Sequence, residues 1–143
     1  VLVQPKHHVS SLSNYFADLE GAGVKAGHFD INQNLLDALR AIDADMPMHV
    51  FTASPKELLE SFSAELQPPF DKLIAAGELG LSKSNPDSYR HLADHFGVET
   101  SELFFIDDTP ARVEAAATAG VKTFHYQNWD QDTARLLNIL QSS

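Results

Sequence analysis

The sequence predicts an α/β domain built on a mostly parallel sheet of about five strands, with helices on both faces. Short apolar runs of strand length alternate with longer segments whose apolar residues recur at helical spacing, which is typical of βαβ units. The clearest unit is residues 103–126, LFFIDDTPARVEAAATAGVKTFHY. It contains an apolar strand, an acidic pair, a helix and a second strand in that order.

Short apolar segments mark the strands. We expect them at residues 1–4, 48–52, 72–76, 103–107 and 121–126. Residues 103–106 are apolar throughout, as expected of a strand that helices cover on both faces.

Apolar periodicity and cap residues mark the helices. The predicted helices cover residues 10–20, 32–42, 55–66, 86–96, 110–119 and the residues after Asp130, while the glycine-rich residues 21–27 form a loop. Ser54 can cap the third helix, with Pro55 at its first position and Glu57 closing a capping box. Thr109 and Pro110 form a similar helix start after the acidic pair.

The composition excludes several classes of function. At 143 residues the chain is predicted to be one domain, residues 1–143. The absence of cysteine excludes a disulfide framework and a thiolate nucleophile. The formal net charge of -10 argues against nucleic acid and anionic membranes as partners. With no visible signal peptide and no apolar run of about 20 residues, we expect a cytoplasmic protein.

Polar residues stand at two predicted strand ends and in one loop. Thr52 ends one strand, Asp107 and Asp108 end another, and Lys83 lies in the loop before a helix. The carboxyl ends of parallel strands share one edge, outside which ligands bind. Two adjacent carboxylates repel each other, so we expect a cation beside Asp107 and Asp108.

These residues lie in the segments VFTAS, ELGLSKSNPDSYRHLADHFGV and FFIDDTPARVEAAATAGVKTFHY, which resemble the haloacid dehalogenase (HAD) superfamily. The resemblance covers residues 32–126, in the family's order and approximate spacing. It implies a Rossmann-like HAD core of phosphatase ancestry. Receiver domains of response regulators place the acidic pair first and the lysine last, so the order found here excludes them.

The resemblance implies a role for each motif residue. Thr52 matches the hydroxyl that hydrogen-bonds the transferring phosphoryl group, so Thr52 and Ala53 are expected to bind phosphate. Lys83 matches the lysine that balances the charge of phosphate and nucleophile. Asp107 and Asp108 match the motif that binds Mg²⁺ directly or through water, which makes Mg²⁺ the implied cofactor. Phosphoryl transfer requires such positive charge and a positioned nucleophile.

The family's nucleophile is absent from its expected position. The family has an aspartate at the end of the first strand and a second acid two residues later, where this chain has Gln4 and Lys6. An amide is a poor nucleophile, and the charge of Lys6 opposes Mg²⁺. We therefore expect impaired catalysis, with Lys6 lying against Asp107 and Asp108 in place of the metal.

Other residues offer routes to an active enzyme. His7 or His8 can accept a phosphoryl group or bind a metal. Asp30-Ile31-Asn32 is a faint copy of the acid–x–polar motif, although Asp30 or Asn32 more simply caps the following helix. The alternative function is thus a Mg²⁺-dependent phosphohydrolase with a non-standard nucleophile or a water activated by the motif residues.

The segment between the first motif and the first core helix is short. About two dozen residues separate His8 from Asn32, too few for the helical cap that this branch of the family inserts. We therefore expect the cap to be absent or vestigial and the site to be open. The expected partner is a small phosphate-bearing ligand, a protein or a second copy of the chain.

Overall fold

The computed structural model describes residues 6–11, 16–18, 29–42, 46–127 and 129–141. Its centre is a five-stranded sheet of order β5-β4-β1-β6-β7, in which every neighbouring pair is parallel. The strands are β1 (His7–Ser10), β4 (Met48–Thr52), β5 (Phe70–Ala75), β6 (Leu103–Asp107) and β7 (Lys122–His125). The predicted fold class, an α/β domain with a parallel sheet of five strands, is confirmed.

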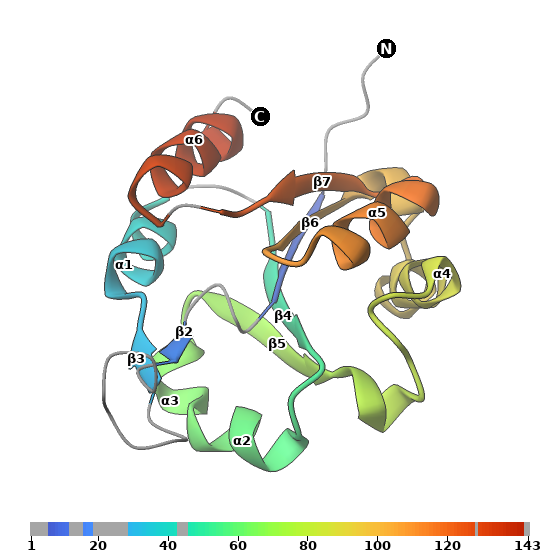
Figure 1. Cartoon of the computed structure of the whole chain (residues 1–143), viewed down its shortest axis with the longest axis horizontal. Coiled ribbons are helices and arrows are strands. Elements are labelled where there is room, and N and C mark those ends of the chain that lie inside the picture. Colours follow the sequence, from blue (N-terminus) through green and yellow to red (C-terminus); the bar gives the residue numbers. More distant parts are fainter. Residues whose placement is uncertain (1–5, 12–15, 19–28, 43–45, 128, 142–143) are drawn as a thin grey trace.

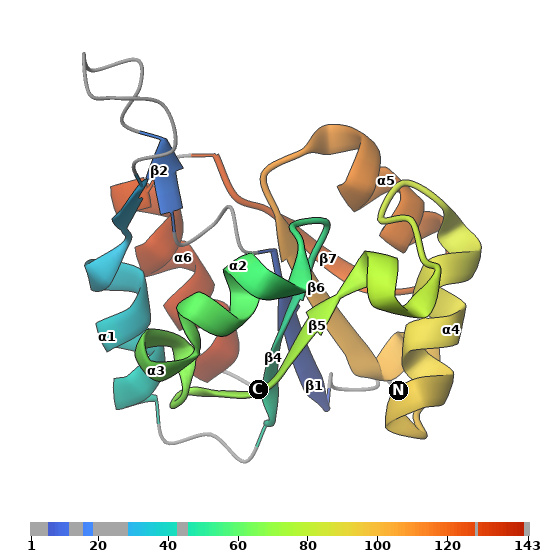
Figure 2. The ribbon, with the colours of Figure 1, turned by 90° about the horizontal axis from the view of Figure 1, so that it is seen from below.

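Helices cover both faces of this sheet (Figures 1 and 2). One face packs against α1 (Gln33–Ala41), α2 (Lys56–Ser61), α3 (Ser63–Leu66) and α6 (Trp129–Gln141). The other face packs against α4 (Pro86–Phe96) and α5 (Pro110–Thr118). Two short 3₁₀ helices, η3 (Ala76–Leu79) and η4 (Thr100–Glu102), follow β5 and precede β6. In the described ranges, no helix has both the length and the apolar character needed to cross a membrane.

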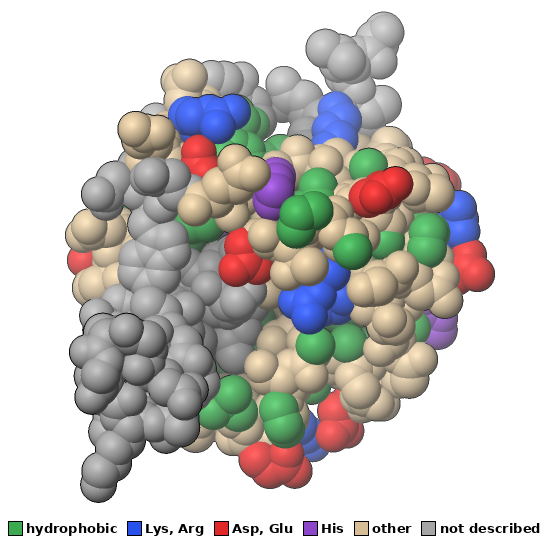
Figure 3. All heavy atoms as spheres, viewed as in Figure 1, with side chains coloured by type: hydrophobic (Ala, Val, Ile, Leu, Met, Phe, Trp, Pro, Cys, Tyr) green, Lys and Arg blue, Asp and Glu red, His purple; other side chains and the backbone are tan. Residues whose placement is uncertain are grey.

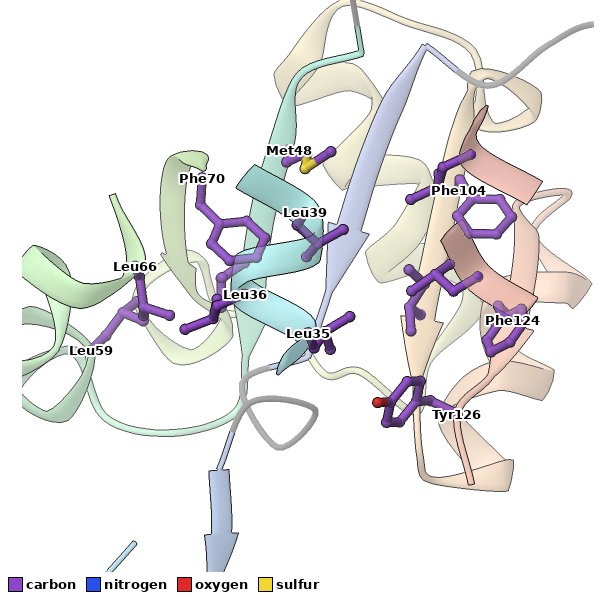
Figure 4. Close-up of a cluster of buried hydrophobic side chains, with 14 of the residues drawn as sticks. Leu35, Leu36, Leu39, Met48, Leu59, Leu66, Phe70, Phe104, Phe124 and Tyr126 are labelled. Carbon is purple, nitrogen blue, oxygen red and sulfur yellow. The ribbon is translucent and has the colours of Figure 1, made fainter. Parts of the chain in front are cut away.

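Two apolar clusters hold the layers together. Figure 4 shows the cluster in which Leu35, Leu36 and Leu39 of α1 lie among side chains of the strands and of α6. On the other face, the ring of Tyr89 packs edge-on against Phe105, with centroids 5.0 Å apart. Burying one such side chain contributes about 1.5–3 kcal/mol to stability, so both faces of the sheet are firmly covered.

Asparagine side chains cap α1 and α4 at their amino ends. Oδ1 of Asn32 accepts a hydrogen bond from the backbone N of Leu35 at 3.2 Å. Oδ1 of Asn85 accepts one from the backbone N of Asp87 at 3.0 Å. Of the two predicted caps for α1, the structure selects Asn32, because Asp30 lies in a strand.

Other predicted helix starts differ from the structure. Pro55 is the residue before α2, and no side chain caps that helix, so the capping box expected at Ser54 is wrong. The single helix expected over residues 55–66 divides at Phe62 into α2 and α3. The last helix begins at Trp129, before Asp130.

The first strand lies further along the chain than predicted. It was expected at residues 1–4, whereas β1 is His7–Ser10 and residues 1–5 lie outside the described part of the chain. β1 is the central strand, and its His8 pairs with Met48 of β4 and Phe104 of β6. Two histidines interrupt the apolar pattern, which is why a search for apolar runs places the strand too early.

The helix expected over residues 10–20 is not formed in the described part of that range. Ser10 belongs to β1, and Phe16–Asp18 forms β2, which pairs antiparallel with β3 (Phe29–Ile31). Pairing with β3 supplies the backbone hydrogen bonds that a helix would make internally. Figure 2 shows this pair beyond the carboxyl ends of the sheet strands, above α1.

Candidate functional site

The predicted site residues lie at the carboxyl edge of the sheet. Thr52 is the last residue of β4, Asp107 is the last residue of β6, and Asp108 follows it. Lys83 lies in the loop between η3 and α4. Figure 1 looks onto this edge, and Figure 3 shows acidic, basic and histidine side chains close together near the middle of the same face. The topology therefore places the motif residues at one edge.

The closest contact among them is an ion pair between Lys83 and Asp107. Nζ of Lys83 lies 2.8 Å from Oδ2 of Asp107, with side chains 2% and 0% exposed. The approach lacks the angles of a well-directed hydrogen bond, so neither atom has such a partner among the described residues. We describe it as an ion pair because charge attraction at 2.8 Å does not depend on those angles. The cation expected beside the acidic pair is therefore Lys83.

The pair shifts the titration of both groups. Burial raises the pKa of Asp107, but the charge of Lys83 and the N–H of Thr109 outweigh burial and hold that pKa below its usual range. Burial lowers the pKa of Lys83, and the Asp107 carboxylate offsets only part of this effect. Each partner thus depends on the other to remain charged in a buried setting.

Neighbouring groups hold the pair in place. The backbone N of Thr109 donates to Oδ1 of Asp107 at 2.8 Å, while the Thr109 side chain makes no cap bond to α5. The Tyr89 hydroxyl donates to the backbone O of Lys83 at 2.5 Å. Nη1 of Arg112 lies 3.9 Å from Oδ2 of Asp107. Sequence reasoning missed Arg112, although its place in the first turn after the acidic pair directs it to this edge.

The end of β7 fixes the backbone of the acidic pair. The backbone N of Tyr126 donates to the O of Asp107 at 2.9 Å. Nε2 of His125 lies 3.2 Å from the backbone O of Asp108, and its Nδ1 lies 3.1 Å from Nε2 of Gln127. Because the Gln127 amide can only donate there, Nε2 of His125 carries the proton. His125 is a second site residue that sequence reasoning missed.

Thr52 stands on the other side of β1 from this cluster. Its Oγ1 accepts a hydrogen bond from the backbone N of Ser54 at 3.0 Å, which leaves the hydroxyl proton available to a ligand. Ala53 follows it and is exposed. Because β1 lies between β4 and β6, these two strands are about 10 Å apart.

Serines occupy the carboxyl end of the central strand. Ser10 pairs with Ile106, and the backbone N of Ser11 donates to the O of Ile106 at 3.0 Å. Ser11 is therefore level with Asp107, at the place where the family resemblance calls for a nucleophilic aspartate. Both serine side chains are buried. The conclusion that this position lacks a carboxylate stands, with Ser11 rather than Gln4 beside the site.

Lys6 does not lie where it was predicted. Its Nζ is 2.6 Å from Oε2 of Glu102, and its backbone N donates to the O of Glu102. Glu102 precedes β6, whereas Asp107 ends it. The strand has five residues, so these edges are about 13 Å apart. The proposed pairing of Lys6 with Asp107 and Asp108 is wrong because β1 begins after Lys6.

The described side chains do not fit a Mg²⁺ ion. Both carboxylate oxygens of Asp107 are engaged, Oδ1 by Thr109 and Oδ2 by Lys83. Asp108 is exposed, and the end of β1 supplies hydroxyls in place of carboxylates. Within the described ranges, no group of three or more histidine, cysteine or acidic side chains is arranged to hold a metal. The poor fit to Mg²⁺ therefore arises because the oxygens of Asp107 already have partners, and not because of the charge of Lys6.

Comparison with known proteins identifies the family. The family model described as haloacid dehalogenase-like hydrolase matches residues 7–120, from β1 through the turn after α5. The chain belongs to the haloacid dehalogenase-like hydrolases. The motif residues and the parallel sheet are therefore those of a HAD core, and the ancestry of the chain is that of a hydrolase.

Named relatives of this HAD chain are phosphatases and related hydrolases. It is 34% identical over 122 residues to flavin mononucleotide hydrolase 1 of Arabidopsis thaliana, covering 79% of this chain and 47% of the relative. It is 28% identical over 89 residues to fructose-1-phosphate phosphatase YqaB of Escherichia coli, covering 61% and 47%. The chain thus spans about half the length of these relatives.

Solved HAD structures share the fold across nearly the whole chain. A HAD family enzyme from Bacteroides thetaiotaomicron, an aspartate-to-alanine mutant in complex with magnesium and inorganic phosphate, has a TM-score of 0.73 at 13% identity and covers 92% of this chain and 98% of its own. A hydrolase from Streptococcus pneumoniae has a TM-score of 0.72 at 14% identity and covers 95% and 100%. At these identities the likeness establishes the fold alone.

Proposed function

We propose that this HAD-like domain binds a small phosphate-bearing ligand at the carboxyl edge of its sheet and does not hydrolyse it by the aspartyl-phosphate route. The observation that carries the proposal is the pair Ser10 and Ser11 at the end of β1. A serine hydroxyl is uncharged, so it cannot replace the carboxylate that forms an aspartyl phosphate. The residue level with Asp107 therefore lacks both the charge and the reactivity of a carboxylate.

The charged side chains described at this edge sum to about zero, because Lys83 and Arg112 offset Asp107 and Asp108. Lys83 and Asp107 balance each other at 2.8 Å, and Arg112 adds a half-exposed guanidinium beside them. Replacing a carboxylate by Ser11 makes the edge one charge less negative than in a family member with the aspartate. A phosphate group placed there meets less repulsion and gains charge-assisted hydrogen bonds.

The hydrogen-bond donors at the edge suit the same ligand. The Thr52 hydroxyl can donate while its oxygen accepts from Ser54. Lys83 Nζ carries three protons, and its contact with Asp107 leaves donors unused. Buried donors of this kind are favourable only when a ligand or water satisfies them. Thr52 and Lys83 are only 2% and 3% exposed, so an anionic oxygen reaches these donors only by displacing the groups that cover them.

Ser10 and His8 do not provide a substitute nucleophile and base. Oγ of Ser10 lies 2.7 Å from Nε2 of His8, which is the distance of an activated hydroxyl. Both side chains are 0% exposed, however, so a phosphorus atom cannot reach the hydroxyl. Burial also lowers the pKa of His8 to about 3, which makes it a poor base at neutral pH.

The relatives support this proposal at two points. The named activities of flavin mononucleotide hydrolase and fructose-1-phosphate phosphatase both concern phosphate esters. The Bacteroides enzyme was crystallised with inorganic phosphate as an aspartate-to-alanine mutant. That HAD core, which also holds magnesium, therefore keeps phosphate after the loss of one aspartate side chain.

Calorimetric titration with inorganic phosphate tests the binding. We expect saturable binding that weakens about tenfold in Arg112→Gln, because one charge-assisted hydrogen bond is lost. Thr52→Val, which removes only a hydroxyl, should also weaken it. Arg90→Gln is the matched control, since Arg90 pairs with Asp87 on the exposed side of α4. Equal affinity in all four proteins, or no binding, would contradict the proposal and leave a protein partner as the remaining candidate ligand.

A further inference from the structure

Three histidines lie on the central strand β1 and its neighbour β4, two on one face of the sheet and one on the other. Nδ1 of His7 in β1 lies 2.9 Å from Nε2 of His49 in β4. The His49 ring stacks on Phe96 of α4 with a centroid distance of 4.3 Å. The His7 ring stacks on the same phenylalanine at 5.0 Å. This contact joins β1 to β4 through neutral rings on the α4 face of the sheet.

His8 occupies the opposite face of β1. Its ring meets the rings of Phe70 and Phe104 edge-on, with centroids 6.5 and 6.3 Å away. Its Nε2 makes one hydrogen bond, to Oγ of Ser10. The residue is 0% exposed. A histidine thus takes a core position in the central strand that an apolar residue would ordinarily hold.

One nitrogen of each buried ring has no partner. Among the described residues, Nδ1 of His8 and Nδ1 of His49 are buried without a hydrogen bond. A neutral ring tolerates this when the unpaired nitrogen is the acceptor. A second proton would add a buried charge and an N–H without an acceptor, which is costly.

The groups around these rings do not compensate for the added proton. Among the titratable groups of the described residues, only His49 acts on the charge of His8, from the opposite face of the sheet. His49 faces Asp71, which favours its protonation, and the cations or rings of Lys72, His7 and His95, which oppose it. Burial lowers the pKa of His8 to about 3 and, with His7, the pKa of His49 to about 4, from 6.5.

His7 is affected less than the other two. It is half-buried and faces the carboxylates Glu102 and Asp71 and the cations Lys72 and Lys6. Burial lowers its pKa, and the two carboxylates partly offset that effect. The seam between β1 and β4 therefore depends mainly on His8 and His49.

We propose that β1 is an acid-sensitive seam, from which His8 and His49 are released and then protonated increasingly often as the pH falls below neutral. A histidine that is neutral in the folded chain but takes up a proton when unfolded contributes full stability above pH 6.5. That contribution is lost as the pH falls from there toward the lower, folded-state pKa. Because β1 lies between β4 and β6, its release divides the sheet.

The charge of the rest of the chain predicts that stability should rise as the pH is lowered. The net charge is -10 at pH 7 and the isoelectric point is about 4.9, so acidification toward that point reduces self-repulsion. Between pH 7.5 and 5.5, a loss of stability therefore indicates the histidines, whereas nearer pH 4 carboxylates with a lowered pKa, such as Asp107, also contribute. Each of the two should raise the unfolding equilibrium constant about tenfold per pH unit below 6.5, or about a hundredfold together.

Urea unfolding of the whole chain at pH 7.5, 6.5, 5.5 and 4.5 tests the proposal. The variants are His8→Phe with Ser10→Ala, which keeps a ring between Phe70 and Phe104, and His49→Phe, which keeps the stack on Phe96. Each should lose about half of the pH dependence. The control is His91→Gln, since His91 is exposed on α4 and the slope should not change.

A second measurement, on the wild-type protein, tests the proposal even if the variants fail to fold. Imidazole nitrogen shifts of the folded wild-type protein should show His8 and His49 still neutral at pH 5.5, while the unfolding constant already rises. Stability that is constant or increases from pH 7.5 to 4.5 would overturn the proposal. So would either histidine titrating in the folded protein near pH 6.5, or a wild-type slope in both variants.

Discussion

Lys83 and Asp107 form a buried ion pair that joins the loop before α4 to the end of β6, with Nζ and Oδ2 2.8 Å apart. Both residues belong to motifs that the family uses around a phosphoryl group. In this chain they satisfy each other, with Thr109 and Arg112 as the nearest further partners of the carboxylate. The pair is therefore a structural element of the site.

Removing one partner of this pair should be more costly than removing both. We expect Lys83→Met to destabilise the fold by about 3–5 kcal/mol, because it leaves the Asp107 carboxylate buried without its cation. The double variant Lys83→Met with Asp107→Leu should recover most of that loss. Urea unfolding at pH 7 measures both values. A double variant that is less stable than Lys83→Met alone would contradict this account.

Lys83→Met should also change how the stability of the fold depends on pH. In the wild type, Lys83 and Thr109 hold the pKa of Asp107 below 3.8, so the carboxylate contributes stability that is lost only as the pH falls through that lowered pKa. Without Lys83, the effect of burial, which raises the pKa of Asp107, is opposed only by the remaining contacts such as the N–H of Thr109. The stability deficit of Lys83→Met should therefore shrink between pH 7 and pH 5. A deficit that stays constant over this range would show that charge is not its cause.

Gly120 ends α5 in a conformation that favours glycine. Its φ is 95°, and a Cβ there would lie 3.0 Å from Oγ1 of Thr100. Gly120→Ala should therefore cost about 1–2 kcal/mol from backbone strain, with the contact to Thr100 adding to it. Gly77→Ala is the matched control, since Gly77 has no positive φ and nothing within 4 Å of a Cβ. Thermal melting of the two variants should separate them by several degrees, and equal melting temperatures would contradict the argument.

Variants at two helix starts test whether the structure or the sequence pattern identifies the capping residues correctly. Asn85 accepts a hydrogen bond from the first turn of α4, so Asn85→Ala should cost about 1 kcal/mol. Ser54 has the stronger sequence signature, yet no side chain caps α2, so Ser54→Ala should change the unfolding free energy by less than about 0.5 kcal/mol. A larger loss at Ser54 than at Asn85 would favour the sequence prediction over the structure.

The sequence predicted the strands and site residues whose local signals are strong. Residues 103–106 of β6 are apolar, and the acidic pair and Pro110 that follow them leave little freedom for another structure. β1 was misplaced because His7 and His8 do not look like core residues. Only the surrounding rings and the hydrogen bond to Ser10 make a buried neutral histidine acceptable. The contacts of Arg112 and His125 depend on tertiary packing, which no local pattern encodes.

Placing β1 too early also assigned the position of the family's nucleophile to the wrong residue. With β1 at residues 1–4, Gln4 and Lys6 appeared to replace the acids of the first motif. The register of β1 with β6 brings Ser11 beside Asp107 instead. Register depends on pairing across the sheet, so a shift of a few residues moves a whole motif without changing the fold.

The central claim is that the site retains a phosphate pocket but has no nucleophile. The direct test is the rate of hydrolysis of an aryl phosphate by the native chain, with and without Mg²⁺, beside Asp107→Asn and a double variant. The double variant is Ser11→Asp with Ser13→Asp, which puts one acid level with Asp107 and a second acid two residues later in the sequence, as in the family motif. We predict no turnover by the native chain under either condition and Mg²⁺-dependent turnover in the variant that restores two acids. Mg²⁺-dependent turnover by the native chain, lost in a folded Asp107→Asn protein, would contradict the account and show an active phosphohydrolase.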